Sequence, residues 1–482
     1  MSIQSVWQKS FDFLGTQPIV VEPSAGQLTS DAGLLPIRQF DEQVGLTEQF
    51  AGALDDRRHE PFVDHSFLQM VRMRVFGILA DYPDQNDHDL LRSDPVFKLI
   101  AGLTPEDHDL ASQPTLSRFE NTVDVASLNR LRDVFLDQFI ASFDTPPVRL
   151  TFDIDPFDDP THGAQQLTFF HGYYGQYQYL PRAITCADND QVVMICLLFG
   201  TAHPALGADD DLQYLVDRLR REWPDVEIHL RADSGFATPT MYRTCERLGI
   251  WYTIGLGMNP VLKRSSEELL EQTVENFEKT GEEQRVFCAF WYQARSWSRA
   301  RYTIIKCEAH AQGTNRRAIV TNRPGAPILP EATYNAYVQR GESENRNKEL
   351  KCGLHADRLS DHRYLANLFR LYLHCAAHNL LVRLRRAVAN PPPAEKHPEI
   401  PTEAFPGNQR RRHFNQRRQQ DPLGEGHPAT WQTRLIKVAA EIIPSSRRIL
   451  VRLSGCWPYL NHYREVSEAV LGLAKNVPLR PG

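Results

Sequence analysis

The stretch V-R-L-T-F-D-I-D, residues 148–155, decides the fold that we predict for this chain. Apolar and polar side chains alternate along it, which is typical of a β-strand with one buried face. One face carries Val148, Leu150, Phe152 and Ile154, and the opposite face carries Thr151, Asp153 and Asp155. Pro156 follows and is expected to end the strand, because proline has no backbone N–H to donate. Asp155 is therefore expected at the carboxyl end of a strand.

A second strand downstream ends in the same way. The run V-E-I-H-L-R-A-D-S-G-F, residues 226–236, alternates again, and Asp233 stands at its end before a glycine turn. Ligands bind at the carboxyl ends of strands in open α/β sheets. Two aspartates at adjacent strand ends repel each other and raise each other's pKa, and a divalent cation between them relieves that repulsion.

The segments around these two strands continue an α/β pattern. Strand-like runs cover residues 177–186, 191–200 and 250–256, and helical runs cover 209–223 and 239–248. Residues 257–333 are too long for a loop and contain three more strand-like runs, so we predict a β-rich insertion there.

A charged helix is predicted over residues 337–351, Y-V-Q-R-G-E-S-E-N-R-N-K-E-L-K. At about 100° per residue, Tyr337, Arg340, Glu344 and Lys351 fall on one arc of roughly 60°. A carboxylate between cations on one face suits a metal-bound, phosphate-bearing substrate. The alternative is a solvated face with pairs such as Arg340 to Glu344. The two aspartates at strand ends favour the first interpretation.

Charge is distributed unevenly along the 482 residues, whose net charge is −6. Residues 1–150 hold 12 Lys and Arg against 23 Asp and Glu, a net of −11, whereas residues 381–482 hold 17 against 8, a net of +9. The basic tail suggests a polyanionic partner.

The eight cysteines form no C-x-x-C pair, which argues against a zinc knuckle. Without a signal peptide or a run of about 18 apolar residues, we expect a cytoplasmic protein and no membrane span.

Three motifs together resemble the DDE transposases of bacterial insertion sequences. They are D-I-D at 153–155, R-A-D-S-G-F at 231–236, and Tyr337-x2-Arg340-x3-Glu344-x6-Lys351. The last spacing is similar to the Y-R-E-K signature of the insertion sequence 4 group. The runs T-S-D-A-G-L-L, S-Q-P-T-L-S-R-F-E-N and G-A-Q-Q resemble the insertion sequence 1380 family in particular. The resemblance covers roughly residues 20–390 and parts of 430–460.

The resemblance implies an α/β fold with an RNase H-like catalytic core, in which helices flank a mixed central sheet. It also implies a β-rich insertion, a mainly α N-terminal domain and a small C-terminal region. The expected boundaries are a helical domain for DNA binding or dimerisation at 1–145, core at 146–256, insertion at 257–333, core again at 334–389, and a Pro-rich linker, Arg-rich segment and small C-terminal unit at 390–482.

The resemblance also implies the site residues. The catalytic triad maps to Asp155, Asp233 and Glu344, which would hold two Mg²⁺ ions, with Mn²⁺ as a substitute. Asp153 faces the same side of its strand and remains an alternative ligand. Phe157 stands where the family usually has a threonine. The expected DNA contacts are Tyr337, Arg340, Lys348, Lys351, the stacking candidate Trp297 (with Trp291 and Tyr292 as other aromatic candidates), and Arg410, Arg411 and Arg412 of the Arg-rich segment.

The implied function is DNA transposition. The protein would cut at the terminal inverted repeats of its insertion sequence and join the 3′-OH ends to target DNA. Its partners would be double-stranded DNA and a second copy of the chain in a synaptic complex, at the nucleoid of a bacterial cytoplasm. Two alternatives stay open: an RNase H-like nuclease without strand transfer, and a catalytically silent DNA-binding protein derived from a transposase. A glycosidase is disfavoured because cations, not a sugar-binding pattern, accompany the carboxylates.

Overall fold

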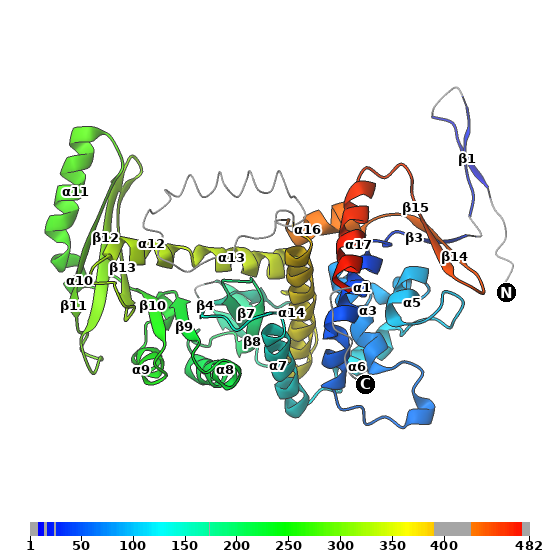
Figure 1. Cartoon of the computed structure of the whole chain (residues 1–482), viewed down its shortest axis with the longest axis horizontal. Helices are drawn as coiled ribbons and strands as arrows, with labels where there is room; N and C mark the ends of the chain where they lie inside the picture. Colours follow the sequence, from blue (N-terminus) through cyan, green and yellow to red (C-terminus); the bar gives the residue numbers. More distant parts are fainter. Residues whose placement is uncertain (1–7, 14–16, 24–25, 173, 390–425, 475–482) are drawn as a thin grey trace.

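The computed structural model describes residues 8–13, 17–23, 26–172, 174–389 and 426–474 (Figure 1). A mixed ten-stranded sheet forms one half of the elongated molecule, and a helical assembly around the long helix α14 (Tyr364–Ala387) forms the other. None of the helices in the described part of the chain is long and apolar enough to cross a membrane.

Five strands in the middle of the sheet position the carboxylates. Their order is β8 (Val192–Phe199), β7 (Gln176–Cys186), β4 (Arg149–Pro156), β9 (Glu227–Ala232) and β10 (Trp251–Leu256). β7 runs antiparallel to both of its neighbours, β8 and β4, whereas β4, β9 and β10 run parallel to one another. The short strands β5 (Asp159–Pro160) and β6 (Phe169–His171) also pair with β7.

The alternation seen in the sequence explains how this sheet is covered. Leu150, Phe152 and Ile154 of β4 are fully buried in a core with α7 (Val125–Ile140), α8 (Ala208–Glu222) and α9 (Pro239–Arg247). The helices α12 (Pro330–Val338) and α13 (Gly341–Lys348) run along the opposite face (Figure 1). The polar face of β4 is therefore the face that meets α13.

The insertion extends the central sheet. Its strands are β11 (Gln284–Tyr292), β12 (Arg301–His310) and β13 (Gly313–Thr321), and β13 pairs antiparallel with β10. Two helices, α10 (Pro260–Ser265) and α11 (Glu267–Thr280), pack on one face of these strands, and α12 packs on the other. The insertion thus joins the sheet edge that lies next to β9.

The N-terminal and C-terminal parts share one hydrophobic core with α14. The N-terminal helices are α1 (Leu34–Val44), α2 (Leu46–Gly52), α3 (Phe67–Leu79), α4 (His88–Leu91), α5 (Pro95–Ala101) and α6 (Gln113–Glu120). The C-terminal elements are α16 (Pro428–Trp431), β14 (Ala440–Pro444), β15 (Ile449–Leu453) and α17 (Leu460–Ala474). β14 pairs with β3 (Gln27–Thr29), so the two ends of the described chain close one sheet. A separate ribbon, β1 (Lys9–Phe11) and β2 (Ile19–Val21), projects beyond them (Figure 1).

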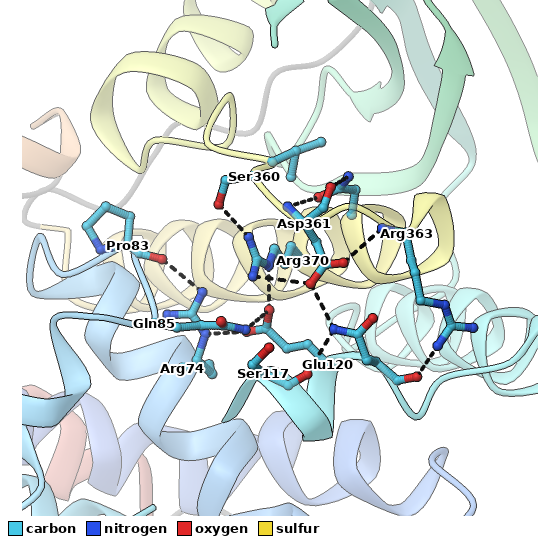
Figure 2. A network of polar contacts seen from close by, with 12 residues as sticks. Arg74, Pro83, Gln85, Ser117, Glu120, Ser360, Asp361, Arg363 and Arg370 are labelled. Carbon is cyan, nitrogen blue, oxygen red and sulfur yellow. Dashed lines mark hydrogen bonds and ion pairs between the residues drawn. The ribbon is translucent and has the colours of Figure 1, made fainter. Parts of the chain in front are cut away.

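A buried ionic network fastens the N-terminal helices to α14. Figure 2 shows Arg74 of α3 and Arg370 of α14 converging on Glu120 at the end of α6. Arg74 Nε lies 2.7 Å from Glu120 Oε1, and Arg370 and Gln85 both donate to Oε2. Arg370 also donates to Ser360 in the loop before α14. Because Glu120 and Arg74 are buried, these pairs replace lost hydration and fix how α3, α6 and α14 fit together.

Candidate active site

Asp155 lies at the end of β4 and Asp233 directly follows β9, and these two neighbouring strands end at the same edge of the sheet. β4 and β9 run parallel, and their register pairs Ile154 with Ala232. Asp155 and Asp233 are the next residues, so both stand at the carboxyl edge, as their place in the sequence predicts. Asp233 also caps the short 3₁₀ turn Ser234–Phe236, because its Oδ1 accepts a hydrogen bond of 2.8 Å from the backbone N–H of Gly235.

The segment predicted as one helix over residues 337–351 is interrupted twice. α12 ends at Val338, Gln339 and Arg340 form a turn, and α13 begins at Gly341. A π-helical turn then covers Glu349–Gly353. The prediction of a single regular helix is therefore wrong, and the face calculated at 100° per residue does not continue to Lys351. Gly341 favours the first break because glycine is a poor helix former.

Arg340 connects the carboxylates. Its Nη1 lies 3.4 Å from Asp155 Oδ1, and its Nη2 lies 3.7 Å from Glu344 Oε1. Glu344, with 56% of its side chain exposed, lines a pocket of about 510 Å³. Asp233, Tyr337 and Arg340 line the same pocket. The broken helix still brings Tyr337, Arg340 and Glu344 to one place.

Asp155 is the carboxylate of the group whose charged form is disfavoured by its surroundings. Burial raises its pKa to about 7, and the negative charges of Asp233 and Glu344 act in the same direction against the guanidinium of Arg340. Its Oδ2 accepts hydrogen bonds from Ser343 Oγ at 3.4 Å and Asn347 Nδ2 at 3.3 Å. Nearby carboxylates that raise one another's pKa create the electrostatic condition that a bound cation relieves.

Asp153 has a different environment. Arg231 Nε and Nη2 lie 2.6 Å from its two oxygens, across the β4–β9 pair, and the Asp153 side chain is almost fully buried. Both oxygens of Asp153 thus bind Arg231 on the neighbouring strand β9. Asp155, in contrast, lies at the end of β4 beside Arg340, which also contacts Glu344. This geometry favours Asp155 over Asp153 as the first acidic residue of the site.

Two lysines lie along the same segment but outside the pocket. Lys351 Nζ lies 2.7 Å from Asp158 Oδ1, in the turn that follows Asp155. The π-helical turn gives Lys351 this position. Lys348 is exposed one turn after Glu344.

The side chain of Trp297, which we expected to contact DNA, is buried in this structure. Only 6% of Trp297 is exposed, because its ring packs edge-on against Tyr242 and Tyr292 at centroid distances of 5.1 and 5.4 Å. Trp291 is the exposed tryptophan of the insertion, at 68%. Arg410, Arg411 and Arg412 lie outside the described residues.

The donor types at the site suit a hard divalent cation, since Asp155, Asp233 and Glu344 offer only carboxylate oxygens. Within the described ranges, however, no three His, Cys, Asp or Glu side chains come close enough together to hold a metal ion. Arg340 lies between two of the three carboxylates. The donor atoms of these residues therefore suit a magnesium-type ion, and the three side chains are too far apart in this structure to share one ion.

Three further residues of the site were not predicted from the sequence. Ser343 and Asn347, one turn apart on α13, hold Asp155, and Arg317 of β13 lines the pocket. The spacing of Ser343 and Asn347 around Glu344 is a usable signal, because residues four apart share a helix face. No sequence signal places Arg317, because its position follows from the pairing of β13 with β10.

Comparison with known proteins identifies the family of this chain. A family profile described as Transposase DDE domain group 1 matches residues 11–397, most of the chain. The piggyBac transposase synaptic complex with hairpin DNA is similar at a TM-score of 0.41 and 13% identity, over 78% of this chain and 81% of that one. No curated protein matches. On the extent of the family match, the chain belongs to the DDE transposases, in Transposase DDE domain group 1.

Proposed function

We propose that the chain cuts DNA at the terminal inverted repeats of an insertion sequence and joins the freed 3′-OH ends to target DNA by phosphoryl transfer. The observation that carries this proposal is the link that Arg340 makes between Asp155, at the end of β4, and Glu344, in the pocket that Asp233 lines. A cation beside carboxylates at the carboxyl edge of a sheet suits a phosphate-bearing substrate.

The strand order supports an RNase H-like core for this reaction. Three antiparallel strands followed by two strands parallel to β4 form the centre of the sheet. In this proposal the core comprises residues 146–256 and 334–389, and the insertion at 257–333 interrupts it. The N-terminal part, residues 1–145, would serve DNA binding or dimerisation, and residues 390–482 would add a basic contact to the DNA backbone.

Asp155, Asp233 and Glu344 would hold the Mg²⁺ ions, two in number, that such a reaction uses, with Mn²⁺ as a substitute. Divalent ions bound there would lower the pKa of the attacking water and neutralise charge on the departing 3′-oxygen. Asp153 would stay paired with Arg231, an ion pair that joins β4 to β9 two residues before Asp155.

The other residues of the site would bind the DNA backbone. Arg340 offers a guanidinium that lies between Asp155 and Glu344, where its planar fork would bind a phosphate oxygen of the DNA. Tyr337 lines the same pocket, and Lys348 and Lys351 lie farther along the segment. Ser343 and Asn347 would keep Asp155 Oδ2 fixed, so that Oδ1 faces the reacting groups.

A two-stage assay tests the proposal. A labelled duplex with the element's own end is incubated with the protein and Mg²⁺, first alone and then with supercoiled target plasmid. Transposition predicts a cut at the repeat boundary and then covalent joining, in a complex that contains two copies of the chain. Cutting without joining would indicate an RNase H-like nuclease, and binding without cutting would indicate a silent DNA-binding protein.

A further inference from the structure

The insertion contributes directly to the pocket beside the carboxylates. β13 runs antiparallel to β10, and Leu256 at the carboxyl end of β10 lies opposite Ala318. The two residues before Ala318, Arg316 and Arg317, therefore reach the sheet edge at which Asp233 follows β9. Both arginines line the pocket of about 510 Å³ together with Asp233 and Glu344. Strand pairing, and not proximity in sequence, brings them to the site.

Three neighbouring cations of the insertion are already paired. Arg316 Nη1 lies 2.9 Å from Glu267 Oε2 and donates to the carbonyl of Lys263. Lys306 Nζ lies 2.5 Å from Glu308, which is also within 3.9 Å of Arg285. Arg317 is different. Its side chain is exposed, and it forms no hydrogen bond or ion pair with any residue in the part of the chain that the structure describes.

Arg317 lies on the face of the insertion that meets α12. It pairs across the sheet with Lys306, whose Nζ lies over the ring of Tyr334 at 5.6 Å. Tyr334 and Tyr337 line the pocket from α12, and Arg340 follows them. Two guanidinium groups from distant segments, Arg317 and Arg340, thus line one pocket with two carboxylates.

Guanidinium groups beside carboxylates are suited to a ligand that carries both a phosphate and a bound cation. We propose that Arg317 is a phosphate-binding residue of the active site, and that it holds a backbone phosphate of the DNA strand beside the bond that is cut. This inference rests on the function proposed above. It makes the insertion part of the active site, because β13 supplies Arg317, a guanidinium group without an ion-pair partner among the described residues.

The test compares the full-length wild type with Arg317→Ala, Arg317→Lys and the control Arg285→Ala. Arg285 is on the same face of the insertion but outside the pocket, and it already pairs with Asn335 and Glu308. The rate of cutting the labelled element end is measured at saturating DNA. Affinity is measured against NaCl concentration in a Glu344→Gln background, so that cutting does not interfere. Thermal unfolding verifies that every variant is folded.

We expect Arg317→Ala to slow cutting by roughly 10- to 100-fold, as for loss of a charged hydrogen bond. The slope of log affinity against log salt should fall by about 0.9, one phosphate contact. Arg317→Lys should keep the slope but not the rate, because lysine keeps the charge and loses the planar fork. Arg285→Ala should match the wild type in cutting rate.

Wild-type values for Arg317→Ala, or equal losses in Arg317→Ala and Arg285→Ala, would overturn the assignment. If the wild type itself does not cut, or cuts as well after Glu344→Gln, the proposed function fails instead, and the two failures are distinguished.

Discussion

Arg340 Nη1 lies 3.4 Å from Asp155 Oδ1 and thereby joins the turn between α12 and α13 to the end of β4. The pair offsets part of the cost of burying the Asp155 carboxylate, but the pKa of Asp155 still lies near 7. Ionised Asp155 therefore lowers the free energy of unfolding, and such a loss of stability is common where residues are selected for function.

Replacing Asp155 should stabilise the protein at alkaline pH. The folded-state pKa is about 7 against an ordinary 3.8, so the unfolded chain loses this proton first and stability falls as pH rises from about 4 to 7. Asp155→Asn removes that penalty and should raise the free energy of unfolding at pH 8 by up to about 4 kcal/mol, and by less at pH 5. Urea unfolding in EDTA measures both values.

Asp153→Asn is the matched control for that experiment, because it leaves the Arg231 guanidinium buried without its anion. It should destabilise the protein at both pH values. A loss of stability in Asp155→Asn at pH 8 would contradict the conclusion that the charged Asp155 carboxylate destabilises the folded protein.

Asn347 should matter for cutting more than its neighbours on α13. Asn347→Ala removes a hydrogen bond to Asp155 Oδ2 and is expected to slow cutting about tenfold or more, since hydrogen bonds to charged groups contribute about 1.5–3 kcal/mol. Asn345→Ala, which loses only a bond to Glu342, should cut at the wild-type rate. Single-turnover cleavage compares them, and equal rates for both variants would argue against a positioning role for Asn347.

Gly255 should resist substitution because Tyr337 lies against it. A Cβ at position 255 would stand 2.7 Å from the Tyr337 hydroxyl and 3.0 Å from the backbone nitrogen of Ser234. Gly255→Ala must therefore displace Tyr337 or the turn after Asp233, and it should lower DNA cutting while the chain stays folded. Gly257→Ala, with no atom within 4 Å of the added carbon, is the control, and cutting equal to that control would contradict this contact.

The central strands were predictable from the sequence because one side of the sheet is apolar and the other carries polar groups. Alternation in residues 148–155 and 226–236 located β4 and β9 and placed Asp155 and Asp233 at their ends. The extension of the sheet by the insertion was not predictable, because the pairing of β13 with β10 joins segments about sixty residues apart.

The helical segment was only partly predictable. Periodicity grouped Tyr337, Arg340 and Glu344 correctly, but Lys351 lies within a π-helical turn, where that periodicity no longer applies. Tertiary contacts favour that turn: Glu349, its first residue, is buried and ion-paired with Arg346 and with Arg385 of α14. Trp297 could not be separated from Trp291 by residue type, because burial under Tyr242 and Tyr292 depends on how distant segments pack.

The network around Glu120 should carry much of the stability of the helical half. Glu120→Ala leaves Arg74 and Arg370 buried without their common anion, which should lower the free energy of unfolding by about 3–5 kcal/mol. Glu275→Ala, which breaks an exposed pair with Lys279, should change it by less than about 1 kcal/mol. Chemical unfolding followed by circular dichroism measures both, and similar losses would mean that the network is not a main fastening of α3 and α6 to α14.

Metal-dependent cleavage of the element's own end tests the central claim most directly. Wild type and Glu344→Gln are compared on one labelled duplex with Mg²⁺, with Mn²⁺ and with EDTA, and DNA binding is recorded in parallel. We predict cutting at the repeat boundary with either ion, none with EDTA, and a loss of cutting in Glu344→Gln with binding nearly intact. Undiminished cutting by Glu344→Gln, or cutting in EDTA, would contradict the assignment of Asp155, Asp233 and Glu344 as the catalytic carboxylates.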